Sequence, residues 1–466
     1  MEEQTNVHIE WTLVDYSDNQ FKATMMASGN YPDILANVFS VNQVAQYGAA
    51  GNLLPLEDYV DTVMPNFQIV LKEIPELRAI CTNSDGHIYG LPRIIKSGTN
   101  DAAPIINKTW LKAVGKDIPT TIDEFVEVLR LFRDNDLNNN GDPNDEIPLG
   151  VCQPYIYTDI RHWMTPFNVD ASPRNQFVCV RDGVVYFSPA LPEYKDAVKW
   201  LRKLYQEKLL DQEAFTISSN AFIAKGKNPD MLLGAFCDFS GANIVGQERF
   251  DEHYTPFPPL KGPEGIQLWN EDRADYTTNA GNITDNAKDP ELCARWLDLL
   301  YIPDHSIQVY WGSFGVVVEK VGEKQYRIIP PPEGMTDSEF RRANTICLEP
   351  HYIDMMNWLT PDYFETPYQK ARFDGYRAVK DYFPKETFPA AMALSADEIE
   401  TINNYYPDLS SYANQKLAEW VTGVSDIDVE WDLYIKELEA LGLKEYETVK
   451  NNMYKSYLEV MAKSKK

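Results

Sequence analysis

Short apolar strands that lead into helices recur along this chain, and they constrain its fold more than any other feature. The run 104–107, Pro-Ile-Ile-Asn, has the character of a buried strand, and a helical pattern follows at once from Lys108. Further strands are expected at 7–14, 32–37, 87–92, 184–186 and 231–236. Strands that alternate with helices are typical of layered α/β proteins. The sequence therefore predicts an α/β fold.

The length of the chain predicts more than one lobe. A chain of 466 residues is too long for a single hydrophobic core, since cores stop growing beyond roughly 250–300 residues. From Ser395 onward the pattern is almost entirely helical, with helices expected over 397–405, 409–422, 429–441 and 444–461. We therefore expect two or three lobes and a helical C-terminal region.

Composition excludes several classes of protein. The formal charge of −27 is opposite in sign to that of a nucleic-acid binder, and it favours a soluble monomer. The six cysteines form no C-x-x-C pair, so each is interpreted as a small core residue. No apolar run approaches the ~20 residues that cross a bilayer. No signal peptide is recognised in the sequence, so we expect either that it has been removed or that the chain is cytoplasmic.

The stretch 134–148, DNDLNNNGDPNDEIP, resembles the opening of an EF-hand calcium loop. Oxygen-bearing side chains alternate before a glycine, as a hard cation requires. The candidate ligands of a structural Ca²⁺ ion are Asp136, Asn138, Asn140, Asp142, Asp145 and Glu146. Glu146 comes five residues after Gly141, whereas the standard loop closes after six. The alternative is an acidic, Asn-rich turn that ends the helix begun by the capping pair Thr121 and Glu124.

Four stretches together resemble an extracellular solute-binding protein of a bacterial ABC transporter, of the large carbohydrate-binding kind. They are 85–92 (DGHIYGLP), 106–148 with its helix and calcium-like loop, 286–301 (NAKDPE, then WLD and Tyr301), and the C-terminal series 418–443 (AEWVTG, then WDLY). The second stretch is the most specific, and the four span nearly the whole chain in the order of that family.

The resemblance implies a type II periplasmic-binding-protein-like fold, with two α/β lobes joined by hinge strands. The chain would leave the first lobe near Ile105 and Ile106, return near Ile283, and cross again near Cys347. The expected lobes are 1–105 with 283–346, and 106–282 with 347–466. The family normally has a strand before the helix that here starts at Met1, so that strand is expected to be missing, together with the lipid-anchor cysteine.

A sugar site needs flat aromatic rings for stacking and polar groups for its hydroxyls. The candidate aromatic residues are Tyr155, Trp163, Phe236, Phe239, Trp269, Tyr276, Tyr310 and Trp311, and the polar candidates are Arg93, Asp238 and Glu349. For each ring alone, ordinary packing is the competing interpretation. As a set they favour a site, because they are expected in loops and lack helical periodicity.

We therefore expect a binding protein that captures a mono- or oligosaccharide between its lobes by hinge closure. The resemblance implies permease subunits as partners and an extracellular place as a cell-surface lipoprotein in the full-length form. No catalytic motif stands out, so the chain is not expected to be an enzyme. The alternatives are a carbohydrate-active hydrolase or lyase and a ligand-presenting sensor. The acidic surface disfavours polyanionic glycans, although a local arginine could override it.

Overall fold

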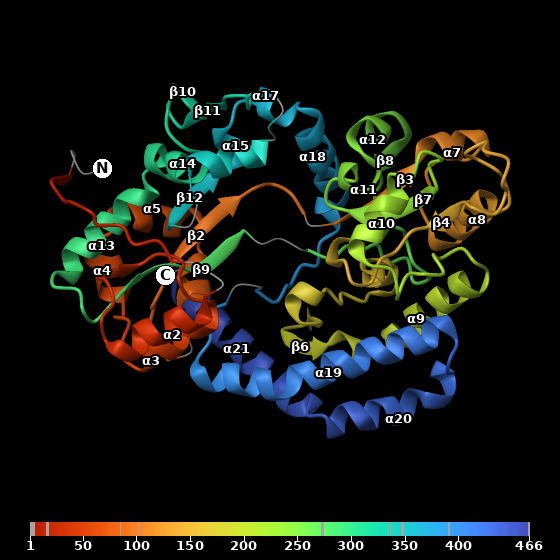
Figure 1. The fold of residues 1–466 in the computed structure, drawn as a ribbon. Coiled ribbons are helices and arrows are strands. Elements are labelled where there is room, and N and C mark those ends of the chain that lie inside the picture. Colours follow the sequence, from red (N-terminus) through yellow and green to blue (C-terminus); the bar gives the residue numbers. More distant parts are fainter. Residues whose placement is uncertain are drawn as a thin grey trace.

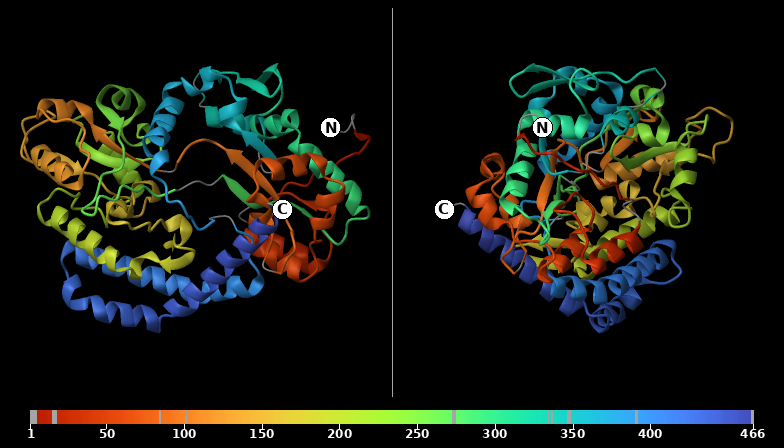
Figure 2. Two further views of the ribbon diagram at one scale, coloured as in Figure 1. Left: turned by 180° about the vertical axis from the view of Figure 1, so that it is seen from behind. Right: turned by 60° about the vertical axis from the view of Figure 1, so that its left-hand side comes forward.

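The computed structural model describes residues 5–464 except 15–17, 84, 101, 272–274, 334, 336, 346–348 and 390–391. The described part forms two halves, each built on its own four-stranded sheet, and long C-terminal helices run beneath both (Figure 1, Figure 2). The predicted α/β fold with two lobes and a helical C-terminal region is confirmed. None of the described helices combines the length and apolar character that crossing a membrane requires.

The first half is centred on a sheet with the strand order β1–β9–β2–β12. In this sheet β2 runs parallel to β12 and antiparallel to β9, which is antiparallel to β1. The strands are β1 (Ile34–Leu35), β2 (Leu91–Lys96), β9 (Tyr276–Ile283) and β12 (His351–Asp354), with the separate hairpin β10 (Val318–Gly322) and β11 (Gln325–Ile328). The helices are α2 (Asn19–Ser28), α3 (Val41–Ala49), α4 (Glu57–Thr62), α5 (Pro65–Glu73), α6 (Leu77–Cys81), α13 (Pro290–Asp298), α14 (Pro303–Trp311), α15 (Asp337–Asn344), α16 (Met355–Trp358) and α17 (Pro361–Phe364).

The second half has a sheet with the order β4–β7–β3–β8, in which only β4 and β7 are parallel. Its strands are β3 (Ala103–Asn107), β4 (Ile147–Leu149), β7 (Leu233–Asp238) and β8 (Tyr254–Pro256), with the hairpin β5 (Val178–Arg181) and β6 (Val184–Phe187). Its helices are α7 (Lys108–Ala113), α8 (Ile122–Arg133), α9 (Pro192–Gln206), α10 (Ser219–Gly226), α11 (Ala242–Val245), α12 (Gln247–His253) and α18 (Pro367–Val379), and 3-10 turns include η1 (Ile156–Thr158) and η2 (Ile160–Phe167). All six residues of β7 are buried, as its mainly apolar sequence predicts.

The chain crosses between the halves at 97–102, between β2 and β3, and returns at 257–275, between β8 and β9. Trp269 in the second crossover donates from Nε1 to the carbonyl oxygen of Ala102 in the first, over 2.9 Å. Asn100 Nδ2 donates to the carbonyl oxygen of Asn270, over 3.1 Å. A third crossing leads from α17 into α18, which packs on β3. The crossovers therefore lie together, as hinge motion requires.

The lobe boundaries differ from those expected from the sequence. Strand β9 pairs with β2, so 276–282 belongs to the first sheet and the return crossing comes before Tyr276, not near Ile283. Strand β12 also pairs with β2, although it was expected in the second lobe. Hydrogen bonding to a neighbouring strand decides sheet membership, and periodicity within one strand cannot reveal its neighbour. The crossing expected near Cys347 lies outside the described residues.

The C-terminal region consists of α19 (Ala396–Thr422), α20 (Ile427–Ala440) and α21 (Leu443–Ser464). Helix α19 packs on α9, and α21 contacts β6 in the second half and α6 in the first. The sequence predicted two helices here, but α19 continues through Pro407. An interior proline costs ~3 kcal/mol. Burial of Leu409, Ala413 and Leu417 along one face of α19 offsets that cost.

One predicted strand is absent. Residues 7–14 form neither a strand nor a helix in the described structure, and Trp11 and Leu13 are exposed. Trp11 instead packs edge-on against Trp296, with ring centroids 6.2 Å apart. Alternating residues form a strand only where a sheet edge receives them.

Candidate functional site

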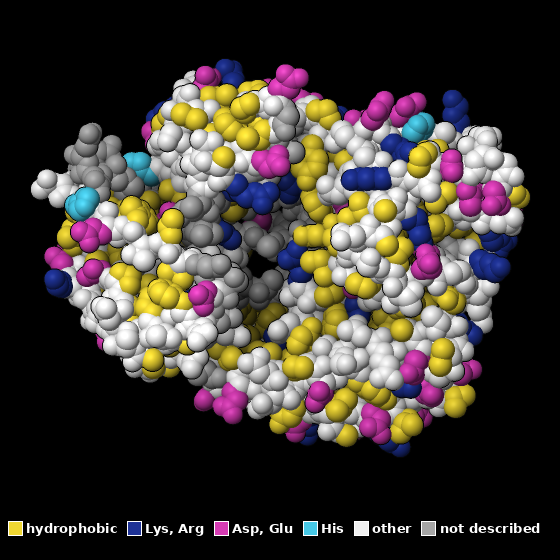
Figure 3. Space-filling model, in the orientation of Figure 1, with side chains coloured by type: hydrophobic (Ala, Val, Ile, Leu, Met, Phe, Trp, Pro, Cys, Tyr) yellow, Lys and Arg dark blue, Asp and Glu magenta, His cyan; other side chains and the backbone are white. Residues whose placement is uncertain are grey.

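An open hollow lies between the two halves on one face of the molecule (Figure 3). In the orientation shared with Figure 1, β9 and β2 lie to one side of it and the half that contains β7 lies to the other. Lys and Arg side chains gather on its upper rim near α15, whereas most visible Asp and Glu side chains lie farther out. A molecule held in this hollow would contact both halves at once.

A pocket rich in aromatic side chains lies at the carboxyl end of β7. This aromatic pocket is lined by Tyr155, Tyr157, Ile223, Lys227, Phe239, Ala242, Asn243, Gln247 and Tyr368. The residues come from the turn around η1, from α10, from the segment 239–247 after β7, and from α18. Asp238 at the end of β7 pairs with Ala103, which follows the first crossover, so this end of the strand lies close to the hinge.

The rings of the aromatic pocket support one another. Tyr157 packs edge-on against Tyr155, with centroids 5.0 Å apart, and against Phe239, with centroids 4.9 Å apart. Aromatic pairs prefer such edge-to-face contacts, and each contributes about 0.5–1.5 kcal/mol beyond area burial. The contacts hold three rings in fixed orientations. Flat rings beside the amides of Asn243 and Gln247 suit a ligand with apolar faces and hydroxyl edges.

The sequence Asp-Phe-Ser-Gly at 238–241 explains why Phe239 faces this pocket. Asp238 Oδ1 accepts hydrogen bonds from the backbone nitrogens of Ser240 (2.9 Å) and Gly241 (3.1 Å), which closes a tight turn. Gly241 has φ +66°, and a Cβ there would lie 2.3 Å from the ring of Phe250. Complete burial raises the pKa of Asp238 to about 6. Asp238 therefore shapes the pocket from beneath and does not line it.

Tyr155 and Phe239 are the predicted ligand residues that line the aromatic pocket. Four other predicted aromatic residues are packed inside the protein and not in open loops: Trp163, Phe236, Trp269 and Trp311 are at most 4% exposed. Trp163, in η2, stacks on Phe125 with centroids 5.1 Å apart and an interplanar angle of 10°. The sequence did not reveal these positions, because segments that look irregular can still be buried.

The remaining predicted ligand residues lie in the first half and are partly buried. Tyr276 donates from its hydroxyl to Glu76 Oε1 (3.3 Å), and Tyr310, in α14, lies beneath Arg341. The carbonyl oxygen of Glu349 accepts a hydrogen bond from His351 Nδ1 (2.8 Å). Burial lowers the pKa of His351 to about 3, so its ring is neutral. Arg93, on β2, pairs with His351 across the sheet.

Sequence reasoning missed Tyr157, Lys227, Asn243 and Tyr368. Tyr157 stands two residues after Tyr155 in an aromatic stretch, and that spacing was a signal that could have found it. Tyr368 is more than 120 residues from Phe239 in sequence and lies at the start of α18. Only the packing of α18 on the second sheet brings it to the pocket.

The calcium-like loop at 134–146 follows α8 and turns carboxylates inward. Asp136 Oδ2 accepts from the backbone nitrogen of Gly141 (3.0 Å), and Glu146 Oε1 accepts from that of Leu137 (2.6 Å). Their other oxygens, Asp136 Oδ1 and Glu146 Oε2, are buried and have no hydrogen-bond partner in the described structure. Such orphaned carboxylate oxygens suit a hard cation. Burial also raises the pKa of Glu146.

The other predicted calcium ligands satisfy one another within the loop. The amide nitrogens of Asn138 and Asn140 donate to Asp145, over 3.0 and 2.6 Å, and Asp142 Oδ1 accepts from the backbone nitrogen of Asn144. Within the described residues, no group of three or more His, Cys, Asp or Glu side chains is arranged to hold a metal ion. The donor atoms are therefore of the type that calcium uses, but they are not gathered into a complete cage.

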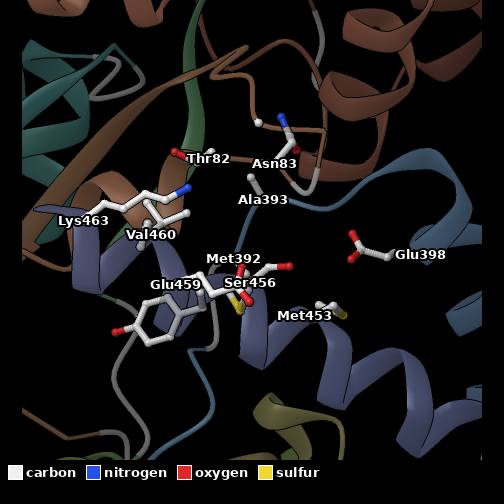
Figure 4. A pocket seen from close by; sticks show the side chains of 13 residues that line it. Thr82, Asn83, Met392, Ala393, Glu398, Met453, Ser456, Glu459, Val460 and Lys463 are labelled. Atoms are coloured by element: carbon white, nitrogen blue, oxygen red, sulfur yellow. The ribbon is translucent and has the colours of Figure 1, made fainter.

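A second hollow lies between α6 and α21, away from the aromatic pocket (Figure 4). It is lined by Ala79, Thr82, Asn83, Gly86, Met392, Ala393, Glu398, Met453, Ser456, Tyr457, Glu459, Val460 and Lys463. Thr82 and Asn83, just after α6, lie across it from Ser456 and Glu459 of α21 (Figure 4). Its lining contains one aromatic ring, and it marks the junction between the first half and the C-terminal helices.

Comparison with known proteins places the chain among transport proteins. Residues 1–227 match the family described as bacterial extracellular solute-binding protein. The fructooligosaccharide ABC transporter substrate-binding protein FusA of Streptococcus pneumoniae is 29% identical over 98% of this chain and 86% of its own. A solved structure of a FusA EF-hand mutant in complex with fructo-nystose is 30% identical, with a TM-score of 0.77 over 98% of this chain and 94% of that one. An HMO-binding, ABC-transporter-associated solute-binding protein from Bifidobacterium longum infantis is 26% identical, with a TM-score of 0.84 over 98% of this chain and 94% of that one.

Proposed function

The chain belongs to the bacterial extracellular solute-binding proteins, and from that premise we propose that it captures an oligosaccharide between its two halves for an ABC transporter. The observation that carries the proposal is the aromatic pocket beside the hinge, in which Tyr155, Tyr157 and Phe239 form a rigid wall next to two amides. The similarity to FusA, whose solved complexes contain kestose and fructo-nystose, supports the same ligand class.

Closure about the three crossovers is the proposed mechanism of capture. In this proposal a saccharide stacks one face on the aromatic pocket, and the first half covers its other face when the protein closes. Binding of both halves by one ligand favours the closed form, because only that form makes both sets of contacts. Under this proposal the lobes are the two sheet-centred halves, and permease subunits recognise the closed form.

We further propose that the loop at 134–146 binds a structural Ca²⁺. The orphaned oxygens of Asp136 and Glu146 support this, as does the EF-hand named for FusA. A bound cation would neutralise carboxylates that are buried together and would hold the end of α8 to β4. No residue of the loop is among the described residues that line the aromatic pocket, so the ion has no contact with the saccharide in this proposal.

The proposed setting is the outer face of the cell membrane, with a lipid anchor in the full-length protein and a monomeric binding unit. Membership of an extracellular family supports the location, and one lipoprotein, LipO of Bacillus subtilis, is 29% identical over 49% of this chain. A ligand-presenting sensor would use the same pocket. A hydrolase or lyase would release reducing ends from a bound oligosaccharide, which a binding protein does not do.

Calorimetric titration of the whole chain tests the proposed function. The panel contains kestose, nystose and other neutral oligosaccharides, with peptides as controls, and reducing ends are assayed in the same samples. We expect binding of one saccharide per chain without turnover, together with a smaller radius of gyration by X-ray scattering when ligand is present. Tight binding of peptides alone, or steady release of reducing sugar, would contradict the proposal.

A further inference from the structure

Cationic side chains surround the aromatic pocket in a protein whose formal charge is −27. Lys227 lines the pocket itself. The guanidinium carbon of Arg372 lies 5.5 Å from the ring centroid of Phe239, and that of Arg174 lies 5.8 Å from the ring centroid of Tyr157. Among the described residues that line the pocket there is no Asp or Glu. Asp238 lies buried beneath the pocket, but it already accepts hydrogen bonds from Ser240, Gly241 and Asn243. The side chains around the pocket are therefore more positive than the molecule as a whole.

The partners of Arg372 are neutral. Its Nη2 donates to Thr99 Oγ1 over 3.3 Å and its Nη1 donates to Gln369 Oε1 over 3.4 Å, both long for hydrogen bonds. Its Nε is buried and has no partner in the described structure. No carboxylate of the described residues forms an ion pair with Arg372 or with Lys227. Asp374, two residues farther along α18, forms ion pairs with Lys370 and Arg377 instead.

A guanidinium that is partly buried without a counter-ion is electrostatically incomplete, because it has lost water and gained no opposite charge. A carboxylate supplies both the charge and two acceptor oxygens that match the planar donors of arginine. The rings of Phe239 and Tyr368 lie beside Arg372, so a carboxylate on a stacked sugar would reach it from the pocket.

We propose that the aromatic pocket selects saccharides that carry a carboxylate, with Arg372 as the group that pairs with it and Lys227 as a second positive charge. This inference rests on the proposed function and narrows its ligand class. The acidic chain was expected to disfavour anionic glycans unless a local arginine overrides it, and in this proposal Arg372 and Lys227 do so. Charges farther away than the Debye length of ~8 Å are largely screened at physiological ionic strength.

Matched glycans that differ only in charge test the inference. Calorimetry on the full chain compares trigalacturonate with its methyl ester and 3′-sialyllactose with lactose, and kestose serves as the probe of saccharide binding in general. We expect at least one acidic member to bind ~10-fold or more tightly than its neutral counterpart, which corresponds to ~1.4 kcal/mol. Raising the salt concentration should narrow that ratio, because it screens the charge pair.

The variant Arg372→Gln should remove most of the preference for the acidic member and leave the affinity for its neutral counterpart within about twofold. The matched control is Arg377→Gln, on the same helix but 54% exposed and paired with Asp374, which should leave both affinities unchanged. A merely structural role of Arg372 would weaken both ligands equally. Thermal melting confirms that each variant is folded. If Arg372→Gln fails to fold, the ratio of acidic to neutral affinity is measured for Lys227→Gln, at an exposed position, where that ratio should fall.

Two results would overturn the inference in distinguishable ways. Binding of kestose or the neutral glycans with equal or greater affinity than the acidic ones would refute acidic selectivity and leave the proposed function intact. Failure of a folded sample to bind any saccharide of the set would refute both.

Discussion

Replacement of Tyr157 with alanine is expected to weaken saccharide binding about tenfold. Tyr157 is the central ring of the aromatic pocket, in contact with Tyr155 at 5.0 Å and Phe239 at 4.9 Å. It is partly buried, so one part of the ring packs against protein and the rest is available to a ligand. The variant therefore removes the surface on which a sugar would stack and also loosens the two neighbouring rings.

The magnitude follows from the area that one ring offers. A sugar that covers the exposed face of a tyrosine hides roughly 60 Å² of apolar surface, which at ~25 cal/mol per Å² is worth about 1.5 kcal/mol. That energy corresponds to about a tenfold change in Kd. Loss of the two ring pairs, at about 0.5–1.5 kcal/mol each, lowers the free energy of unfolding and not the affinity directly.

Calorimetry and thermal melting together separate these two effects. Tyr157→Phe keeps the ring and should bind within about threefold of the parent, because only the hydroxyl is lost. Tyr186→Ala, at a partly buried tyrosine in β6 outside the pocket, is the matched control and should not change affinity. If Tyr157→Ala is folded and binds with the parent affinity, the aromatic pocket is not the ligand site and the reasoning fails.

Three further predictions concern stability. Arg161→Met should lower the free energy of unfolding by ~3–5 kcal/mol in denaturant titration, because it strands the carboxylate of Asp159, which Arg161 pairs at 2.6 Å with both side chains 3% exposed. Burial raises the pKa of Asp238 to about 6, so the folded protein binds this proton more tightly than the unfolded chain does. The free energy of unfolding should therefore fall by up to ~3 kcal/mol as the pH rises from about 4 to 6. Asp238→Asn should lack that slope, so the difference in unfolding free energy between variant and parent should change as the pH rises from about 4 to 6, and a variant with the slope of the parent would contradict the assignment. Chelation of calcium should lower the Tm of the parent but not that of a folded Asp136→Ala variant, while saccharide affinity stays within about threefold; loss of all binding from a folded sample would refute a purely structural ion.

The sequence pattern predicted those strands and helices that depend on interactions between residues close together in the chain. The strand at 104–107 and its helix, the buried strand β7 and the helix that precedes the calcium-like loop are all present, because burial and capping act within a few residues. Thr121 caps α8 as expected, although Glu124 turns to Thr120 and leaves the capping box incomplete. The strand pairing of β9 and β12 depends on partners more than 170 residues away, which no local pattern encodes.

The candidate site shows the same difference between features set by nearby residues and features set by distant ones. Tyr155 and Phe239 were found because each follows a strand, where side chains lie open at a sheet edge. Trp163 and Trp311 sit in segments that look equally irregular, and only the packing of their neighbours shows that they are buried. Arg372 was not predicted as a site residue, because arginine is common in amphipathic helices. Only the three-dimensional structure shows that it lacks a counter-ion among the described residues.

The contact between α21 and α6 limits how the two halves can move. The crossovers join the halves at one place, and α21 touches the first half at another, where the backbone nitrogen of Ala393 also donates to the carbonyl oxygen of Ile80 (2.9 Å). Two halves that are joined both at the crossovers and at the contact between α21 and α6 can rotate only about the line through these two places. Closure is therefore a rotation around one axis. Substitutions in the contact between α21 and α6 would then change how fast the protein closes and releases its saccharide, without changing which saccharide binds. The rate of delivery and the ligand specificity can therefore evolve independently.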